Sequence, residues 1–101
     1  MSTRAKGRKN EFKARDALIS QGYAVTVAPM PSKWSLQNDL WGMWDLCAVG
    51  LESIRFVQVK TNHTASPDWR TQAMAWICPE NCSKELWIYK DRVKEPKIII
   101  L

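Results

Sequence analysis

The alternation of hydrophobic and polar positions predicts seven elements of secondary structure. Residues 5–21 have the periodicity of a helix, and Gly22 follows as a common terminating residue. A second helix is predicted from Pro67 to about residue 78, because Ser66 is a suitable N-cap and Pro79 interrupts the pattern. Runs rich in β-forming residues predict five strands, at residues 23–28, 44–49, 54–61, 85–90 and 97–101.

The order of these elements, αβββαββ, predicts an α/β fold with a mixed central sheet flanked by helices. Residues 29–43, which include two prolines, are expected to form a loop or a loose β-excursion. The 101 residues show no repeat or linker, so we expect a single domain across residues 1–101. No apolar run approaches the roughly 18 residues that a membrane span requires, and no membrane association is expected.

The positive charge is concentrated at the start of the chain. The net charge is +5, and residues 1–15 contain six basic residues and one acidic residue, whereas the remainder is balanced. A dense cationic segment is typical of proteins that bind nucleic acid, although a solvated, solubilising segment has the same composition. We therefore expect a basic N-terminal arm, at about residues 1–10, to contact DNA phosphates through Arg4, Lys6, Arg8 and Lys9.

The cysteine count bears on the compartment. Three cysteines, an odd number, are not typical of a secreted disulfide framework, so we expect a reducing, cytoplasmic environment in a prokaryotic or phage-infected cell. Cys78 and Cys82 have a C-x3-C spacing that Cys47 and His63 would complete as a zinc site. There is no second paired motif, so a zinc site is not expected.

A carboxylate lies on the apolar side of the first predicted helix. On a helical wheel, Glu11 falls near the centre of an arc formed by Phe12, Ala14, Ala17, Leu18 and Ile19. Burial of a carboxylate is costly unless a cation or a metal compensates for it. A first-turn Glu that stabilises the helix dipole, or that pairs with Arg15, is the alternative interpretation.

Two neighbouring strands add further polar groups. Asp45 opens an apolar strand, where an acid is either a ligand or a turn cap. Gln58 and Lys60 share one face of the next strand, where Lys60 is alternatively an ordinary strand end entering water. Together, oxygens of Glu11, Asp45 and Gln58 suit a hard ion such as Mg²⁺ or Mn²⁺. Lys60 is then placed to orient a water or to hold a phosphate.

The sequence resembles the PD-(D/E)XK nuclease superfamily and, within it, the archaeal-type Holliday junction resolvases. The resemblance covers about residues 6–62. It rests on the basic segment that leads into Glu11 (KGRKNE), on the strand that opens at Asp45 (WDLCAV) and on the Gln58-Val59-Lys60 tripeptide. It implies a restriction-endonuclease-like fold and the metal-dependent hydrolysis of a phosphodiester in branched DNA, by a homodimer acting on a four-way junction.

The resemblance also implies roles for individual residues. The counterparts of Asp45 and Gln58 bind the metal, that of Glu11 completes the site, and that of Lys60 assists the attacking water. The family has a serine in the loop before its acidic strand, for which Ser32 and Ser35 are candidates. The expected DNA-binding set is completed by Arg15, Ser32, Lys33 and Trp34.

Gln58 departs from the family pattern, which usually has an acid there. An amide oxygen can coordinate a metal, but the lost negative charge should weaken metal binding. An inactive protein is therefore an alternative expectation. Asp39 is a nearby acid that either replaces the charge or caps the loop. Trp34 and Trp41 lie in a polar segment, where they would stack on unpaired bases or form a dimer interface. The alternatives to a resolvase are a nuclease without junction preference and a non-catalytic DNA-binding protein that retains the fold.

Overall fold

The computed structural model describes residues 3–29 and 39–101. Its two helices are α1 (Thr3–Ser20) and α2 (Pro67–Ala75). Within the described ranges, neither helix has the length and apolar character that crossing a bilayer requires. Its five strands are β1 (Ala24–Val27), β2 (Leu46–Val49), β3 (Ile54–Thr61), β4 (Cys82–Tyr89) and β5 (Lys97–Ile100).

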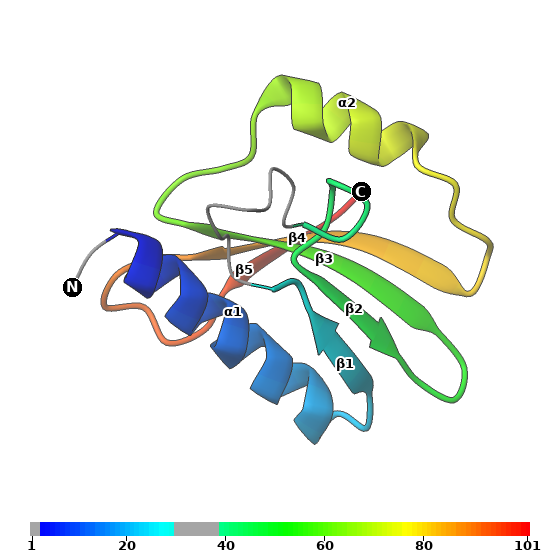
Figure 1. Cartoon of the computed structure of the whole chain (residues 1–101), viewed down its shortest axis with the longest axis horizontal. Helices are drawn as coiled ribbons and strands as arrows, with labels where there is room; N and C mark the ends of the chain where they lie inside the picture. Colours follow the sequence, from blue (N-terminus) through cyan, green and yellow to red (C-terminus); the bar gives the residue numbers. More distant parts are fainter. Residues whose placement is uncertain (1–2, 30–38) are drawn as a thin grey trace.

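The five strands form one mixed sheet in the order β1-β2-β3-β4-β5 (Figure 1). All neighbouring strands are antiparallel except β3 and β4, which run parallel from the pair Ile54–Cys82 to the pair Thr61–Tyr89. A parallel pair needs a crossover connection, and α2 lies within it. The predicted α/β class, with a mixed sheet and the order αβββαββ, is confirmed.

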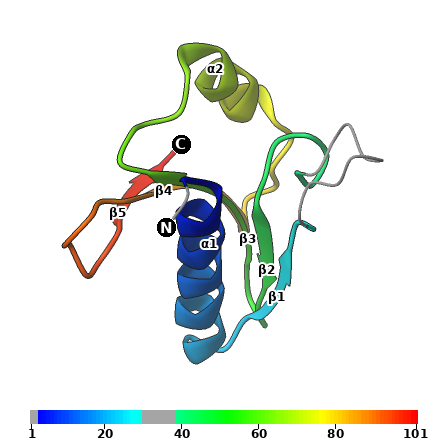
Figure 2. The ribbon, with the colours of Figure 1, turned by 60° about the vertical axis from the view of Figure 1, so that its left-hand side comes forward.

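Helix α1 packs on one face of the sheet (Figures 1 and 2). Ala14 and Leu18 are completely buried against side chains of β2, β3 and β4. The helix ends in a Schellman-type turn, because Gly22 has a φ of 96° and the Tyr23 amide donates to the Leu18 carbonyl at 3.1 Å. This packing fixes the position of Glu11, which lies on the same helix.

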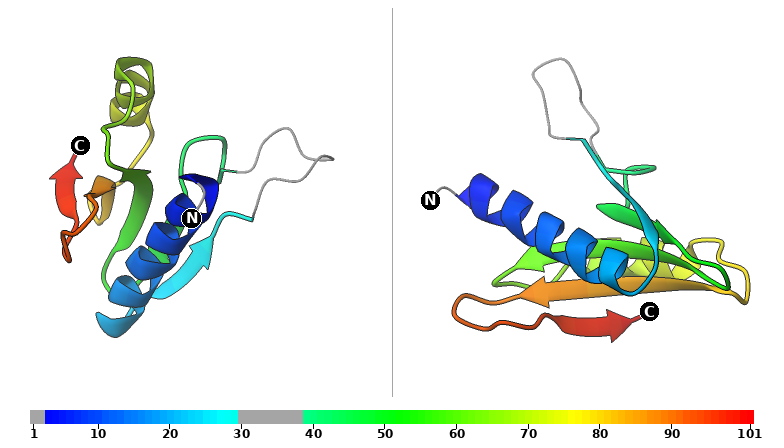
Figure 3. Two further views of the ribbon diagram at one scale, coloured as in Figure 1. Left: turned by 90° about the vertical axis from the view of Figure 1, so that its left-hand side faces the viewer. Right: turned by 90° about the horizontal axis from the view of Figure 1, so that it is seen from below.

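Helix α2 covers the opposite face, as the two views of Figure 3 show. Ser66 caps it by accepting a hydrogen bond from the Trp69 amide, and Pro67 occupies its first turn, as the sequence predicts. Beneath it lies an aromatic cluster centred on the fully buried Trp44, whose ring lies 5.3 Å from that of Trp69 and 5.7 Å from that of Phe56. Trp69 and Trp76 are both half-buried against this cluster.

Several predicted boundaries and faces are wrong. Strand β2 begins at Leu46 and not at residue 44, and β4 begins three residues earlier than residue 85, because it pairs with the whole length of β3. Helix α2 ends before Ile77, which is 90% exposed. Ile19 was assigned to the apolar arc of α1 but is 51% exposed, because it lies in the last turn, at the margin of the packed stripe.

The cysteines also differ from expectation. Cys78 and Cys82 form a disulfide that joins the end of the α2 segment to the start of β4, whereas Cys47 is free. The odd cysteine count argued for reduced thiols, and that prediction is wrong for this pair. Cysteines four positions apart face each other here because the chain turns between α2 and β4, which sequence spacing alone does not reveal.

Candidate active site

Asp45 is held at the point where β1, β2 and β3 meet. Its carbonyl accepts a hydrogen bond from the Ala28 amide at 2.8 Å, and its own amide donates to the Val57 carbonyl at 2.9 Å. Its carboxylate oxygen Oδ2 accepts a third bond, from the Val59 amide, at 2.9 Å. The side chain is 7% exposed. Both the backbone and one carboxylate oxygen of Asp45 are therefore fixed, and the other oxygen accepts no backbone amide bond among the described residues.

Glu11 is brought to this point by α1. Arg8, one turn earlier, donates from Nη1 to Glu11 Oε1 at 3.1 Å and to the Ala28 carbonyl at 2.6 Å. The Arg8 and Glu11 side chains are each 21% exposed. Because the Ala28 amide bonds to Asp45, the guanidinium of Arg8 links Glu11 to the strand end that also holds Asp45. The inward position that the helical wheel predicts for Glu11 agrees with this placement, and the cation that pairs with it is Arg8, not Arg15.

The electrostatics of the cluster show that its acids influence one another. Burial first, and then the negative charges of Glu11 and Asp39 and a side-chain hydrogen bond with Asp39, together raise the pKa of Asp45 to about 8, and only the Val59 amide opposes the shift. Burial likewise raises the pKa of Glu11, against the hydrogen bond and charge of Arg8, and Asp39 adds to the increase. A buried group of acids with raised pKa values is typical of a catalytic or cation-binding site.

Gln58 lies beside Asp45 on the neighbouring strand. The β2–β3 ladder pairs Leu46 with Val57, so Asp45 and Gln58 occupy the next position on the two strands. Gln58 is 6% exposed, and its Oε1 atom is buried without a hydrogen-bond partner within the described residues. A buried carbonyl oxygen without a donor is costly, so this atom indicates a partner that the described residues do not supply.

Lys60 belongs to the same strand as Gln58. It follows Gln58 by two residues and therefore lies on the same face of β3. Within the described residues, 3–29 and 39–101, no hydrogen bond or ion pair joins Lys60 to Glu11, Asp39 or Asp45. The start of α1 does approach this end of β3, because Asn10 Nδ2 donates to Thr61 Oγ1 at 2.8 Å. The structure thus brings Glu11, Asp39, Asp45 and Gln58 together and leaves Lys60 nearby without a partner in the cluster.

The donor set fits a hard divalent ion. The orphaned Oε1 of Gln58 is a neutral oxygen ligand, and Asp45 is a buried carboxylate whose charge a cation would stabilise. In the part of the chain that the structure describes, no three His, Cys, Asp or Glu side chains are grouped to hold a metal by themselves. A metal here would therefore use the Gln58 amide beside the acids, and its contact with Glu11 would compete with Arg8.

A comparison with solved structures gives the fold a counterpart. The chain is similar to Hjc, a Holliday junction resolvase from the archaeal hyperthermophile Archaeoglobus fulgidus, with a TM-score of 0.68 and 14% sequence identity over 93% of this chain and 76% of that chain. This chain has the Holliday junction resolvase fold. No known family profile and no curated protein sequence matches it. The resemblance that residues 6–62 suggest is therefore confirmed for the fold.

Within the resolvase fold, the predicted DNA-binding residues have different surroundings. The basic N-terminal residues project from α1, which begins at Thr3, so the expected arm is the first half of a helix. Arg4 and Lys9 are exposed on it, whereas Lys6 forms an ion pair with Asp91 at 3.0 Å. Arg15 forms an ion pair with Asp16 at 2.9 Å. The remaining predicted contacts, and the serine candidates among them, lie outside the described residues: Ser32, Lys33, Trp34 and Ser35.

The contacts of Arg8 in the resolvase fold differ from those that its sequence position predicts. Arg8 was assigned to phosphate contacts on an arm, but its guanidinium is partly buried between Glu11 and the end of β1, and its Nε atom has no partner in the described chain. The i, i+3 spacing of Arg8 and Glu11 was the signal available in the sequence. Asp39, in contrast, was recognised as a nearby acid, and the structure places it against Asp45.

Proposed function

We propose that this protein is a metal-dependent DNA endonuclease that hydrolyses a phosphodiester in branched DNA, as the resolvase fold suggests. The observation that carries the proposal is the pairing of a buried Asp45, whose pKa is raised to about 8, with the orphaned Gln58 oxygen on the adjacent strand. A surface salt-bridge network has no need of such an arrangement, because its polar groups would be solvated or paired.

In the proposed reaction, a bound Mg²⁺ or Mn²⁺ would supply Lewis-acid polarisation of the phosphoryl group and a water of lowered pKa. Asp45, Gln58 and Glu11 would hold the ion. Arg8, which lies between Glu11 and the end of β1, would donate to a non-bridging phosphate oxygen of the DNA. Lys60, which follows Gln58 on the same face of β3, would orient the attacking water or stabilise the developing charge.

Contacts to the DNA backbone would come from the cationic residues of α1, with Arg4 and Lys9 exposed for this purpose. Recognition of a four-way junction requires two opposed sites, and we extend the proposal to a homodimer. The edge strand β5 offers apolar side chains for such an interface, because Ile98 is 44% and Ile100 is 62% exposed. Sedimentation equilibrium of the purified protein would measure the dimer.

The experiment that tests the proposal is cleavage of labelled DNA. A four-way junction, a flap, a single strand and a linear duplex are incubated with Mg²⁺, with Mn²⁺ or with EDTA, and the products are resolved by strand. The expected result is metal-dependent, symmetric cutting of the junction. Equal cutting of all four substrates would favour a nuclease without junction preference, and binding without any cutting would favour a non-catalytic protein, for which Gln58 in place of an acid is the supporting observation.

A further inference from the structure

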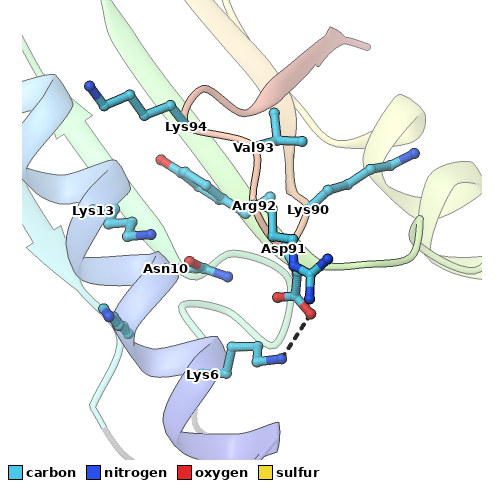
Figure 4. A pocket seen from close by; sticks show the side chains of 10 residues that line it. Lys6, Asn10, Lys13, Lys90, Asp91, Arg92, Val93 and Lys94 are labelled. Carbon is cyan, nitrogen blue, oxygen red and sulfur yellow. Dashed lines mark hydrogen bonds and ion pairs between the residues drawn. The ribbon is translucent and has the colours of Figure 1, made fainter.

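A pocket on the other flank of α1 is strongly cationic. It has a volume of about 620 Å³ and opens between the first half of α1 and the turn that joins β4 to β5 (Figure 4). Its polar and charged lining comes from both elements and comprises Lys6, Lys9, Asn10, Lys13, Tyr89, Lys90, Asp91, Arg92 and Lys94, with Val93 beside them. Six of these side chains are cationic and one is a carboxylate, so the pocket has a large excess of positive charge.

The single carboxylate is already neutralised. Asp91 Oδ2 accepts hydrogen bonds from Lys6 Nζ at 3.0 Å and from Asn62 Nδ2 at 3.1 Å. These contacts, Lys6 first, hold the pKa of Asp91 below its usual value. Among the described residues, no ion pair is formed by Lys9, Lys13, Lys90 or Lys94, and Arg92 acts on Asp91 through its charge without an ion-pair contact. Cations gathered without anionic partners repel one another, and a polyanion would relieve this repulsion.

The two walls of the pocket are fixed relative to each other. The Lys6–Asp91 ion pair joins α1 to the turn, and the Asp91 amide donates to Asn62 Oδ1 at 2.9 Å. Behind them, the 6%-exposed Asn10 donates to Thr61 at the end of β3. Lys13 Nζ lies 6.0 Å from the centre of the Tyr89 ring, a cation–π distance. The cations therefore surround a pocket whose walls are tied together at several points.

We propose that this pocket binds the sugar–phosphate backbone of duplex DNA, at a segment separate from the one presented for cleavage. This inference rests on the proposed DNA-binding function and adds the place of a second contact. Lysine and arginine side chains are typical phosphate ligands, whereas the two lining groups that could read base edges, the Asp91 carboxylate and the Asn10 amide, are already bonded to Lys6 and Thr61. Binding there is expected to be independent of base sequence.

Helix α1 separates the pocket from the candidate active site. Lys6, Lys9 and Lys13 line the pocket on one flank of the helix, while Arg8 and Glu11 face the acidic cluster on the other. The two flanks of a helix are separated by about its diameter, roughly 10–12 Å, which corresponds to about three nucleotide steps along a duplex strand. The start of α1 would thus lie between two contacted stretches of DNA backbone. A branched substrate with two duplex arms can provide both stretches.

The test compares two double variants that each lose two positive charges. Lys13→Gln/Lys94→Gln removes one cation from each wall, and Arg70→Gln/Lys97→Gln removes two cations that do not line the pocket. Affinity for a labelled four-way junction and for a duplex is measured in EDTA by fluorescence anisotropy between 50 and 300 mM salt (about these limits). We expect the pocket variant to reduce the slope of log K against log salt by about 2, and the control by much less.

Equal salt slopes in the two double variants would overturn the proposal. In case the pocket variant does not fold, chemical acetylation of the wild-type protein provides a second measurement, because bound DNA should protect Lys13 and Lys94 while Lys97 remains reactive. Labelling of all three to the same extent would also overturn it. Neither readout needs catalysis, so a protein that binds through this pocket and never cuts would contradict the proposed nuclease while supporting the second contact.

Discussion

The carboxylate of Asp45 accepts a hydrogen bond from the backbone amide of Val59, 2.9 Å away on the neighbouring strand. Asp45 immediately precedes β2, so this bond continues the β2–β3 ladder through a side chain where the backbone pairing ends. One carboxylate oxygen is thereby used to fix the geometry, and the side chain also shares a hydrogen bond with Asp39. The same residue defines both the entry of the strand and the candidate site.

Asp45→Asn is expected to abolish cleavage and to preserve DNA binding. The amide keeps an oxygen that can accept from Val59 but loses the charge that a divalent ion requires. Removal of a group that merely supports a metal ligand costs about 10–100-fold, so removal of the ligand itself should cost at least about 100-fold. Single-turnover cleavage of a labelled junction in Mn²⁺ provides the rate.

The binding half of that prediction is measured by anisotropy in EDTA, with the wild-type protein and Asp16→Asn as controls. Asp16 lies on the exposed side of α1, away from the cluster, and the Asp16→Asn substitution removes the same negative charge. Cleavage at the wild-type rate by Asp45→Asn would show that the site is assigned to the wrong residues. A loss of DNA affinity in that variant alone would show that Asp45 acts mainly through the fold.

Gln58→Glu is expected to tighten metal binding and to increase the rate of cleavage. A carboxylate at this buried position adds the negative charge that the family pattern usually supplies, next to Asp45. In the absence of metal the same charge should destabilise the fold, because it is buried beside acids whose pKa values are already raised. Titration calorimetry with Mn²⁺ and thermal unfolding in EDTA measure the two effects.

Gln58→Leu provides the matched control for that substitution, since it removes the orphaned oxygen without adding charge. It should leave the metal-free protein at least as stable as the wild type, because an unsatisfied buried acceptor is lost. Weaker metal binding by Gln58→Glu than by Gln58→Leu would exclude position 58 from the metal site.

Glu85→Gln is expected to destabilise the fold by about 3 kcal/mol, the lower end of the range for a broken buried ion pair. Glu85 is 2% exposed, and its two oxygens accept from Arg55 Nε and Nη2, each at 2.8 Å. The lower end applies because the Arg55 side chain keeps some contact with solvent. The double variant Arg55→Met/Glu85→Leu should be much closer to the wild type in urea unfolding, and equal losses in both variants would contradict this account.

The contribution of Glu85 should disappear in acid. Burial alone would raise the pKa of Glu85, but hydrogen bonds from Arg55, Ser83 and Trp87 outweigh it, and the pKa is lowered from its usual value of 4.5. The unfolded chain therefore takes up the proton first as the pH falls, so the stabilisation is complete above about pH 4.5 and is lost below it. The stability difference between wild type and Glu85→Gln, measured in urea from pH 7 to pH 3, should shrink over this range.

Trp44 and Trp41 are expected to respond very differently to truncation. Trp44→Ala removes a fully buried indole from the aromatic cluster and should cost about 3–5 kcal/mol, whereas Trp41 is 66% exposed and Trp41→Ala should cost much less. Trp44→Phe is a third informative variant, because the Nε1 atom of Trp44 is buried without a partner in the described chain, and its removal relieves an unsatisfied donor. Urea unfolding midpoints rank the three.

The element types and the fold class were predictable because most of the sequence signals are local. Ser66-Pro67 marks the start of α2 and Gly22 the end of α1, and both act within one helical turn. The boundary of β4 was not predictable in the same way. Residues 82–84 become strand because they pair with Ile54, Arg55 and Phe56, a contact that depends on the whole α2 crossover.

The site was predictable as a set of residue types but not as a geometry. Glu11, Asp45 and Gln58 could be assigned because each is a polar group in an otherwise apolar pattern. The partnership of Arg8 with Glu11 and Ala28, and the approach of residues 90–94 to α1, depend on how the helix packs on the sheet. The sequence does not mark residues 90–94 as a cationic site, because Asp91 and Glu95 largely balance the charges of Lys90, Arg92 and Lys94 locally.

Because β3 pairs in parallel with β4, which comes later in the chain, the sheet around β3 is completed only after β3 has been synthesised. Without residues 82–100, β3 would be an unpaired edge, and it bears the glutamine and the lysine assigned to phosphate cleavage. Every group proposed for catalysis precedes β4 and β5 in the chain, so it is synthesised before the strands that complete the sheet around it. A nascent chain would therefore present the candidate site on an open sheet edge until β4 and β5 dock.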